Sequence, residues 1–328
     1  MKALIVEQVA GRNEMKLGEY PDPEAKEGEV LVRIEATALN RADLMQKEGK
    51  YPPPKGVTSI LGLEMAGTVE KLGPKVKGVS VGDRVCGLLP GGGYAEYCTI
   101  RANHLLKIPE EFSFEEAAAI PEVYLTAYQA AIWLGKLANS ETILIHAGAS
   151  GVGTAAIQLA RELRKSRIIT TTGSGEKCEL TASLGSDLCI NYNDENFAES
   201  IQDTFGENCV DLIIDFVGSP YWEKNVDVLA MDGRVVYLSF LGGTKVEELN
   251  LSPILRKRLT IMGSTLRNRS DEYKAELIAA FQKDSEAQFE KGKLKPIIDS
   301  VFDWEDVEEA HDRMKNNLNA GKIILTGM

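Results

Sequence analysis

The sequence predicts an α/β protein in two parts, a small β-barrel domain and a six-stranded, doubly wound parallel sheet. Its 328 residues exceed one comfortable hydrophobic core. The first third is made of short alternating runs broken by Gly and Pro, whereas from about residue 119 strand-like runs alternate with helix-like ones. We therefore expect one domain at 1–118 with 295–328, and a second at 119–294.

The β domain is predicted by period-two patterning. In residues 29–36, Val30, Val32, Ile34 and Ala36 share one face, which is typical of a half-buried strand. Similar runs follow at 64–73, 81–89 and 94–100, with turn residues between them. This spacing is typical of a small barrel.

The second part reads as a parallel sheet. Strand-like runs lie at 142–146, 167–172, 187–190, 210–218, 233–240 and 258–265, with helix-like stretches between them. Parallel neighbours need crossover connections, and helical crossovers cover both faces of the sheet. The tail, which ends in GKIIL at 321–325, is expected to return to the first domain as a helix and a strand.

Composition limits the function classes. Lys and Arg number 37 against 49 Asp and Glu, so the net charge of −12 argues against a nucleic-acid or anionic-membrane partner. The apolar run at the start is too short for a signal peptide or a membrane span. We expect a cytoplasmic protein.

The cysteines and histidines indicate neither a disulfide framework nor a zinc site. They are few and scattered, and no C-x-x-C pair occurs: Cys86, Cys98, Cys178, Cys189, Cys209, His104, His146 and His311. A reduced protein whose cysteines fill the core is the simplest expectation.

A glycine-rich turn, GASGVG, follows the first strand of the parallel sheet and precedes its first helix. The frame from Gly148 to Gly153 matches G-x-G-x-x-G except that Ser150 replaces the middle glycine. Unpaired N–H groups and the helix dipole favour an anion there, so Gly148, Ser150, Gly151, Val152 and Gly153 are predicted to hold a dinucleotide.

The residues near the expected ribose favour NADPH. An NAD site usually places Asp or Glu about 20 residues beyond the glycines. Here Gly173 and Ser174 end the next strand and Lys177 follows, so a hydroxyl and a lysine stand where a carboxylate would repel a 2′-phosphate. Lys177 could instead be a solvated helix residue.

Several motifs bring a family into view: ALNRADLMQ, GKYPPP, ILGLEMAG, AAAIPEVYLTAYQA and HAGASGVGTAAIQ. Along its whole length the chain resembles the medium-chain dehydrogenase/reductase superfamily, and more closely its zinc-free quinone oxidoreductases. The resemblance implies a GroES-like catalytic domain, a Rossmann cofactor domain and a homodimer. We expect the dimer to join at an exposed edge of the nucleotide sheet, through residues 233–240 and their neighbours. Zinc enzymes of the superfamily carry Cys where Asn40 stands and His where Leu63 stands, and only Glu64 is retained, so no metal is expected.

The resemblance also implies an acceptor site in the cleft between domains, near Asn40, Tyr51 and Ser150. The Tyr51 phenol could donate to a developing oxyanion, or the ring could brace the neighbouring prolines. Asn40 could equally cap the helix that follows it. Ser150 could serve the turn alone or direct its hydroxyl toward the nicotinamide and the quinone.

Further cofactor contacts are implied only by position. They are Thr126 at the carboxamide, Tyr192 beside the adenosine phosphate, Leu241, Gly242, Leu266 and Arg267 on the nicotinamide side, and Lys322 at the phosphates. The expected function is NADPH-dependent reduction of quinones by hydride or net one-electron transfer, with orientation and desolvation as the enzyme's main contribution. Two alternatives stay open: an NADPH-dependent enal or enone reductase, and an NADPH-binding structural or RNA-associated protein.

Overall fold

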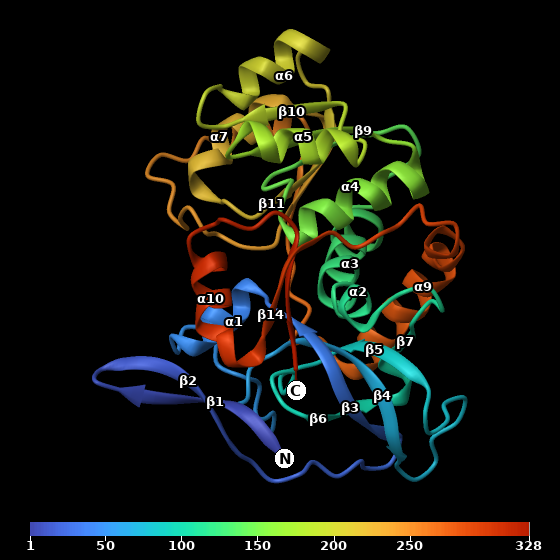
Figure 1. Ribbon diagram of the computed structural model, residues 1–328. Helices are drawn as coiled ribbons and strands as arrows, with labels where there is room; N and C mark the ends of the chain where they lie inside the picture. The colour runs from blue at the N-terminus through green and yellow to red at the C-terminus, as the bar shows by residue number, and fades with distance from the viewer. Residues whose placement is uncertain (328) are drawn as a thin grey trace. The chain divides into compact units, whose positions relative to one another are not determined.

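The computed structural model describes residues 1–327, and these form two compact units. Unit 1 comprises Met1–Val123, Arg267–Gln282 and Pro296–Met328, and unit 2 comprises Tyr124–Leu266 and Lys283–Lys295. Both parts predicted from the sequence are recognisable (Figure 1). These units differ from the expected division mainly in two segments, because residues 119–123 and Arg267–Gln282 belong to unit 1; the second segment includes the first part of helix α9 (Asp271–Glu290).

Unit 2 is built on the predicted parallel sheet. Within the described residues its strand order is β10-β9-β8-β11-β12-β13, and every neighbouring pair is parallel. The strands are β8 (Thr142–Ile145), β9 (Arg167–Thr172), β10 (Leu188–Asn191), β11 (Val210–Asp215), β12 (Leu229–Tyr237) and β13 (Thr260–Gly263). The helices are α3 (Pro121–Tyr128), η2 (Gln129–Leu134), α4 (Gly151–Arg164), α5 (Gly175–Ser183), α6 (Phe197–Phe205), η3 (Ser219–Tyr221), α7 (Trp222–Val228), α8 (Ser252–Arg256) and α9 (Asp271–Glu290), of which α3 and α9 extend into unit 1.

The prediction that residues 233–240 form an exposed sheet edge is wrong. They overlap β12, which lies between β11 and β13, so its backbone is paired on both sides. The edge is instead β13, next along the chain. Periodicity identifies a strand, but the order of parallel strands depends on crossovers that one strand's sequence does not reveal.

Unit 1 contains a β hairpin and a larger mixed sheet. The hairpin joins β1 (Lys2–Val9) to β2 (Arg12–Glu19). The larger sheet has the order β14-β15-β3-β4-β5-β7, and β6 pairs with β3. Its strands are β3 (Glu29–Ala38), β4 (Glu64–Leu72), β5 (Arg84–Leu88), β6 (Tyr97–Arg101), β7 (Leu105–Lys107), β14 (Ile298–Asp303) and β15 (Lys322–Thr326). The helices are α1 (Arg41–Lys47), η1 (Ala102–His104), α2 (Phe114–Ala118), η4 (Trp304–Asp306) and α10 (Val307–Lys315).

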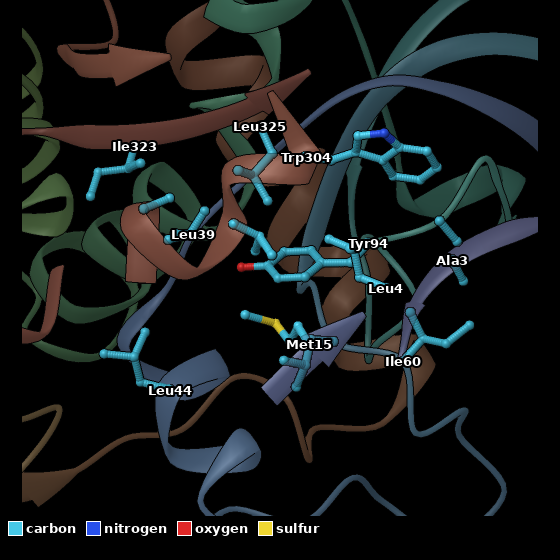
Figure 2. Close-up of a cluster of buried hydrophobic side chains, with 14 of the residues drawn as sticks. Ala3, Leu4, Met15, Leu39, Leu44, Ile60, Tyr94, Trp304, Ile323 and Leu325 are labelled. Carbon is cyan, nitrogen blue, oxygen red and sulfur yellow. The ribbon is translucent and has the colours of Figure 1, made fainter. Parts of the chain in front are cut away.

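The tail returns to unit 1 as the sequence predicted. Strand β15 pairs antiparallel with β3, placing Ile324 opposite Ala38. Figure 2 shows the resulting cluster, in which the ring of Tyr94 is surrounded by apolar side chains from both ends of the chain, among them Leu4 and Leu325. Unit 1 therefore needs its last residues to complete its core.

None of the helices in residues 1–327 combines the length and the apolar character that crossing a bilayer requires.

Candidate functional site

The glycine turn links β8 to α4 at the middle of the parallel sheet, where β8 lies between β9 and β11. This is the position at which open α/β sheets bind nucleotides. Just before the glycines, Ala147 adopts a left-handed φ of 49°. This backbone conformation is uncommon for residues other than glycine, and it is often found at functional sites.

Two of the glycines are required by close packing. A Cβ on Gly153 would lie 2.5 Å from the carbonyl oxygens of Ala147 and Gly148. A Cβ on Gly148 would lie 2.7 Å from the Cβ of Thr170 on β9. The third glycine of the motif thus allows the helix to start against the strand, as the fingerprint requires.

Ser150 is the N-cap of α4, since its Oγ accepts a hydrogen bond from the N–H of Gly153 at 3.0 Å. The reading in which Ser150 serves the turn is thereby observed, and its hydroxyl hydrogen stays available for a second partner. The first N–H groups of a helix have no partner within it, so those of Gly151 and Val152 are candidate donors to an anion.

A series of buried hydrogen bonds starts at His146, the residue before Ala147 and the glycine turn. His146 contacts the Oγ1 of Thr171 at 2.9 Å and the Oδ1 of Asn225 at 2.8 Å. Asn225 donates to Asp215, whose other oxygen accepts from the backbone N–H of Gly218 at 3.0 Å. Burial lowers the pKa of His146, so its imidazole ring is neutral at neutral pH. The neutral ring hydrogen-bonds to both Thr171 and Asn225 and so connects the segments that carry them.

The segment expected at the ribose is arranged as a polar surface. Ser174 is the N-cap of α5 and accepts from the N–H of Lys177 at 3.3 Å. The side chain of Tyr192 is 46% exposed and follows β10. A Cβ on Gly173 would lie 2.6 Å from its hydroxyl, so only glycine allows this approach. The structure thus brings Gly173, Ser174, Lys177 and Tyr192 to the ends of two adjacent strands.

The expectation that all cysteines are reduced is wrong for two of them. Cys178 on α5 and Cys189 on β10 form a disulfide with their Cα atoms 5.3 Å apart. Their separation of 11 residues matches no metal or redox motif, so the sequence carried no signal for the pairing. Cys86 and Cys98 are buried and free, as expected, and Cys209 is free and partly exposed.

In unit 1, a buried polar network includes Asn40 and Glu64, two positions at which the resemblance places ligands of the superfamily's zinc enzymes. The Nζ of Lys322 donates to Glu64 Oε1 at 2.7 Å, to Asn40 Oδ1 at 2.8 Å and to the carbonyl of Leu39 at 2.7 Å. Lys322 is 3% exposed and Glu64 is fully buried. All three ammonium donors are used, so the prediction that Lys322 reaches the cofactor phosphates is corrected.

These residues do not fit a zinc ion. Zinc prefers thiolate, imidazole and carboxylate ligands, whereas this position offers the amide of Asn40 and the apolar Leu63. The one carboxylate, Glu64, already faces an ammonium group. Within the described chain, no cluster of three or more His, Cys, Asp or Glu could hold a metal.

Asn40 occupies the N-cap position of α1, and its backbone N–H donates to Asp43 at 2.8 Å. Its side-chain amide belongs to the network instead, donating to Glu64 at 2.8 Å. Asn40 therefore stands at the N-cap position that the sequence offered, whereas its expected place near the acceptor stays a prediction. Burial raises the pKa of Asp43 to about 6, against the opposing effect of the backbone N–H donors of Asn40 and Gly62.

Glu122 is a titratable residue that the sequence reasoning missed. It lies at the start of α3, and its backbone N–H donates to Glu64 Oε2 at 2.8 Å. Burial, followed by the charge of Glu64, raises the pKa of its carboxyl group to about 8. The group is therefore protonated at neutral pH, and a Pro-Glu pair opening a helix was the only available signal.

Tyr51 is half-buried and lies under the guanidinium of Arg267, whose Cζ is 5.2 Å from the ring centroid. Arg267 donates to the carbonyl of Pro90 and to Gln46 Oε1, each at 2.7 Å. Its Nη1 is buried and has no hydrogen-bond partner within the described residues. Burial raises the pKa of Tyr51 and the nearby guanidinium lowers it, so the phenol is held protonated beside a fixed positive charge.

Four further positions expected to contact the cofactor fall in unit 2: Thr126, Leu241, Gly242 and Leu266. Thr126 lies on α3, and Leu241, which is 57% exposed, precedes Gly242 in the loop after β12. A Cβ on Gly242 would lie 2.9 Å from the Val217 side chain, so this loop approaches the one after β11 closely. Leu266 is the last residue of its segment of unit 2, whereas Arg267 opens a segment of unit 1.

Comparison with known proteins identifies the chain's relatives. Residues 26–110 match the alcohol dehydrogenase GroES-like domain, and residues 151–283 match the zinc-binding dehydrogenase family. Human quinone oxidoreductase is 31% identical over 328 residues, covering 99% of this chain and 97% of the relative. An acryloyl-coenzyme A reductase from Sulfurisphaera tokodaii is 29% identical over 352 residues, covering 99% of both chains.

Solved structures agree with this assignment. The quinone oxidoreductase from Thermus thermophilus, which was also solved in complex with NADPH, has a TM-score of 0.82 and 29% identity over 100% of both chains. The architecture of that protein is the one described above, a GroES-like unit and a parallel nucleotide-type sheet. The chain belongs to the quinone oxidoreductases of the medium-chain dehydrogenase/reductase superfamily.

Proposed function

We propose that this protein is an NADPH-dependent quinone reductase that works without a metal. The observation that carries the proposal is the combination of a glycine turn of the dinucleotide-binding type with the buried Lys322–Glu64 ion pair, since Glu64 is one of the positions at which the resemblance places zinc ligands. The relatives named quinone oxidoreductase support the reaction class. An acceptor that is already electron-poor needs no Lewis acid to take up a hydride.

Unit 2 supplies the cofactor site. Bound NADPH would provide the hydride, and the residues of the chain hold it. The N–H groups of Gly151 and Val152 donate to the pyrophosphate at the N-terminus of α4. The hydroxyl of Ser174 and the ammonium of Lys177 would receive the 2′-phosphate, and the hydroxyl of Tyr192 lies close to the neighbouring Gly173.

Unit 1 supplies the hydrogen-bond donor to the acceptor. Tyr51 carries a phenolic hydrogen at neutral pH, and Arg267 lies over its ring at 5.2 Å. We assign Tyr51 to donate a hydrogen bond to the acceptor oxygen as negative charge develops there. Arg267 is then a positioning residue for Tyr51, a role that differs from the cofactor contact first expected of it.

A second candidate acceptor is an enone or a related conjugated carbonyl. The similarity to the acryloyl-coenzyme A reductase favours it, since that relative covers the whole chain. Both acceptors present a carbonyl oxygen that gains charge when hydride is added, so Tyr51 would serve either. The chain could then differ from a quinone reductase only in the shape of its acceptor site.

The deciding experiment follows NADPH oxidation at 340 nm with an ortho-quinone, a para-quinone and an alkenal, each with and without a chelator. We expect turnover with a quinone and no effect of the chelator. Faster turnover of the alkenal would assign the enone reaction instead. Binding of NADPH without turnover of any acceptor would contradict both, leaving a cofactor-binding module.

Two variants separate the assigned roles. Tyr51→Phe is expected to lower kcat by roughly tenfold or more, because a positioned donor typically contributes at least this much, while NADPH affinity is retained. Ser150→Ala tests whether the hydroxyl acts beyond capping. If it acts on the acceptor, kcat falls while cofactor affinity stays; unchanged kcat would limit Ser150 to the turn.

A further inference from the structure

The disulfide between Cys178 and Cys189 joins the two segments to which we assign the 2′-phosphate. Cys178 follows Lys177 directly on α5, and Cys189 lies on β10, three residues before Tyr192. Helix α5 packs on β9 and β10, as Figure 1 shows. The bridge therefore fixes the position of one side of the proposed phosphate site relative to the other.

Neighbouring contacts make these segments a single unit. The carbonyl of Gly173 accepts from the side chain of Asn193 at 2.9 Å, and the N–H of Tyr192 donates to the carbonyl of Thr172 at 3.0 Å. The Oγ1 of Thr172 lies 3.1 Å from the sulfur of Cys178 and 3.5 Å from that of Cys189. Both sulfurs thus contact Thr172, the residue directly before Gly173.

Both cysteines are partly exposed, so a reductant in solution can reach the bridge. A dithiol reduces it in two steps. One thiolate of the dithiol attacks a protein sulfur and breaks the S–S bond, which leaves a mixed disulfide and a protein thiolate. The second thiol of the reductant then displaces the other protein sulfur, so that the protein gains two electrons and two protons and the reductant becomes a disulfide.

We propose that Cys178 and Cys189 form a reversible thiol modification site that sets the protein's preference for NADPH over NADH. The inference rests on the proposed function, because it takes Ser174, Lys177 and Tyr192 as the 2′-phosphate site. In the oxidised form the bridge holds α5 against β10 and preorganises these groups. In the reduced form this constraint is lost. Part of the binding free energy of NADPH is then used to order these groups, so the affinity for NADPH falls.

The pyrophosphate site is not touched by this change. The bridge spans α5 and β10, whereas the pyrophosphate donors lie at the start of α4. NADH lacks the 2′-phosphate and makes no use of the constrained groups. The affinity for NADH is therefore the internal reference for the affinity for NADPH.

The test measures the Kd of NADPH and of NADH by calorimetry, before and after treatment with dithiothreitol. Reduction is expected to raise the Kd of NADPH by roughly three- to tenfold, as loss of preorganisation in one loop would, and to leave the Kd of NADH within about twofold. Cys178→Ser, Cys189→Ser and the double variant should match the reduced protein and no longer respond to dithiothreitol. Cys209→Ser, at the partly exposed free cysteine, is the matched control and should respond like the unchanged protein.

A thiol titration of the denatured protein checks the chemistry, with only Cys86, Cys98 and Cys209 reactive before reduction and all five cysteines after it. A thermal melt measures stability alongside. If reduction lowers Tm but leaves the ratio of the two Kd values unchanged, the bridge is structural only and the proposal is wrong. If the oxidised protein shows no preference for NADPH, the assignment of the 2′-phosphate site fails instead.

Discussion

The ammonium of Lys322 and the carboxylate of Glu64 lie 2.7 Å apart at a place where neither side chain is more than 4% exposed. Desolvating two charges is costly, and their attraction offsets that cost only when further hydrogen bonds satisfy both groups. Asn40 does this for each of them. The buried carboxylate of Glu64 therefore has both an ammonium partner, Lys322, and an amide donor, Asn40.

Replacing Lys322 alone should reveal the free-energy cost of burying the Glu64 carboxylate without a partner. Lys322→Met is expected to lower the free energy of unfolding by about 3 to 5 kcal/mol, since it leaves a buried carboxylate unpaired. Adding Glu64→Gln to it should restore much of the loss, which urea denaturation measures. The affinity for NADPH, measured on folded protein, should not change; a large loss for Lys322→Met would return this lysine to the cofactor phosphates.

Glu122 gives a pH dependence with a defined sign. Its carboxyl pKa is raised from 4.5 to about 8 in the folded protein, so the folded state keeps a proton that the unfolded state releases. The contribution of Glu122 to stability is therefore complete below pH 4.5 and is lost as the pH rises to about 8. Glu122→Gln should flatten the fall in unfolding free energy across this window.

The control for this measurement is Glu286→Gln, which changes an exposed glutamate on α9. Its pH profile should follow that of the unchanged protein. If Glu122→Gln shows the same slope as Glu286→Gln, the raised pKa is contradicted.

At the scale of elements, the strand-to-helix turn was predictable because its chemistry is local. Gly148, Ser150 and Gly153 are separated by a fixed spacing, and the strand before them and the helix after them have clear periodicities. The bridge between α5 and β10 and the ion pair of Lys322 were not predictable. Each joins residues whose proximity depends on strand order or on the returning tail, which one sequence does not encode locally.

The turn offers a direct test of its packing. Gly153→Ala places a Cβ 2.5 Å from two carbonyl oxygens, so we expect a loss of about 1 to 3 kcal/mol in unfolding free energy and a marked rise in the Kd of NADPH. Gly263→Ala on β13 is the matched control, because a Cβ there meets nothing within 4 Å. Equal behaviour of the two variants would show that the turn tolerates a side chain.

At the scale of the whole molecule, β13 leaves one side of its backbone unpaired at the end of the parallel sheet within the described residues. Beside it lies a hollow of about 260 Å³ lined by residues that include Tyr237, Phe240, Ile261 and Met262. Exposed strand edges are usually covered, and the homodimer implied by the family resemblance would cover this one. We place the expected dimer contact on β13 rather than on β12.

The mass in solution tests this placement. Light scattering should give twice the subunit mass of 35.9 kDa, and Ile261→Lys should shift the protein toward the monomer. Val301→Lys is the matched control, since Val301 is similarly exposed, at 50% against 42%, and lies on β14 at the edge of the unit 1 sheet. A monomeric unchanged protein, or a dimer that survives Ile261→Lys, would rule out this contact.

The pairing of β15 with β3 has a consequence for biosynthesis. The core around Tyr94 needs Ala3 and Leu4 from β1 and Leu325 from β15, so the nascent chain must leave the ribosome as far as β15 before unit 1 can close. Every strand of the parallel sheet has left the ribosome once Gly263, the last residue of β13, has done so. Synthesis from the N-terminus therefore allows the parallel sheet of unit 2 to fold while unit 1 still lacks β15.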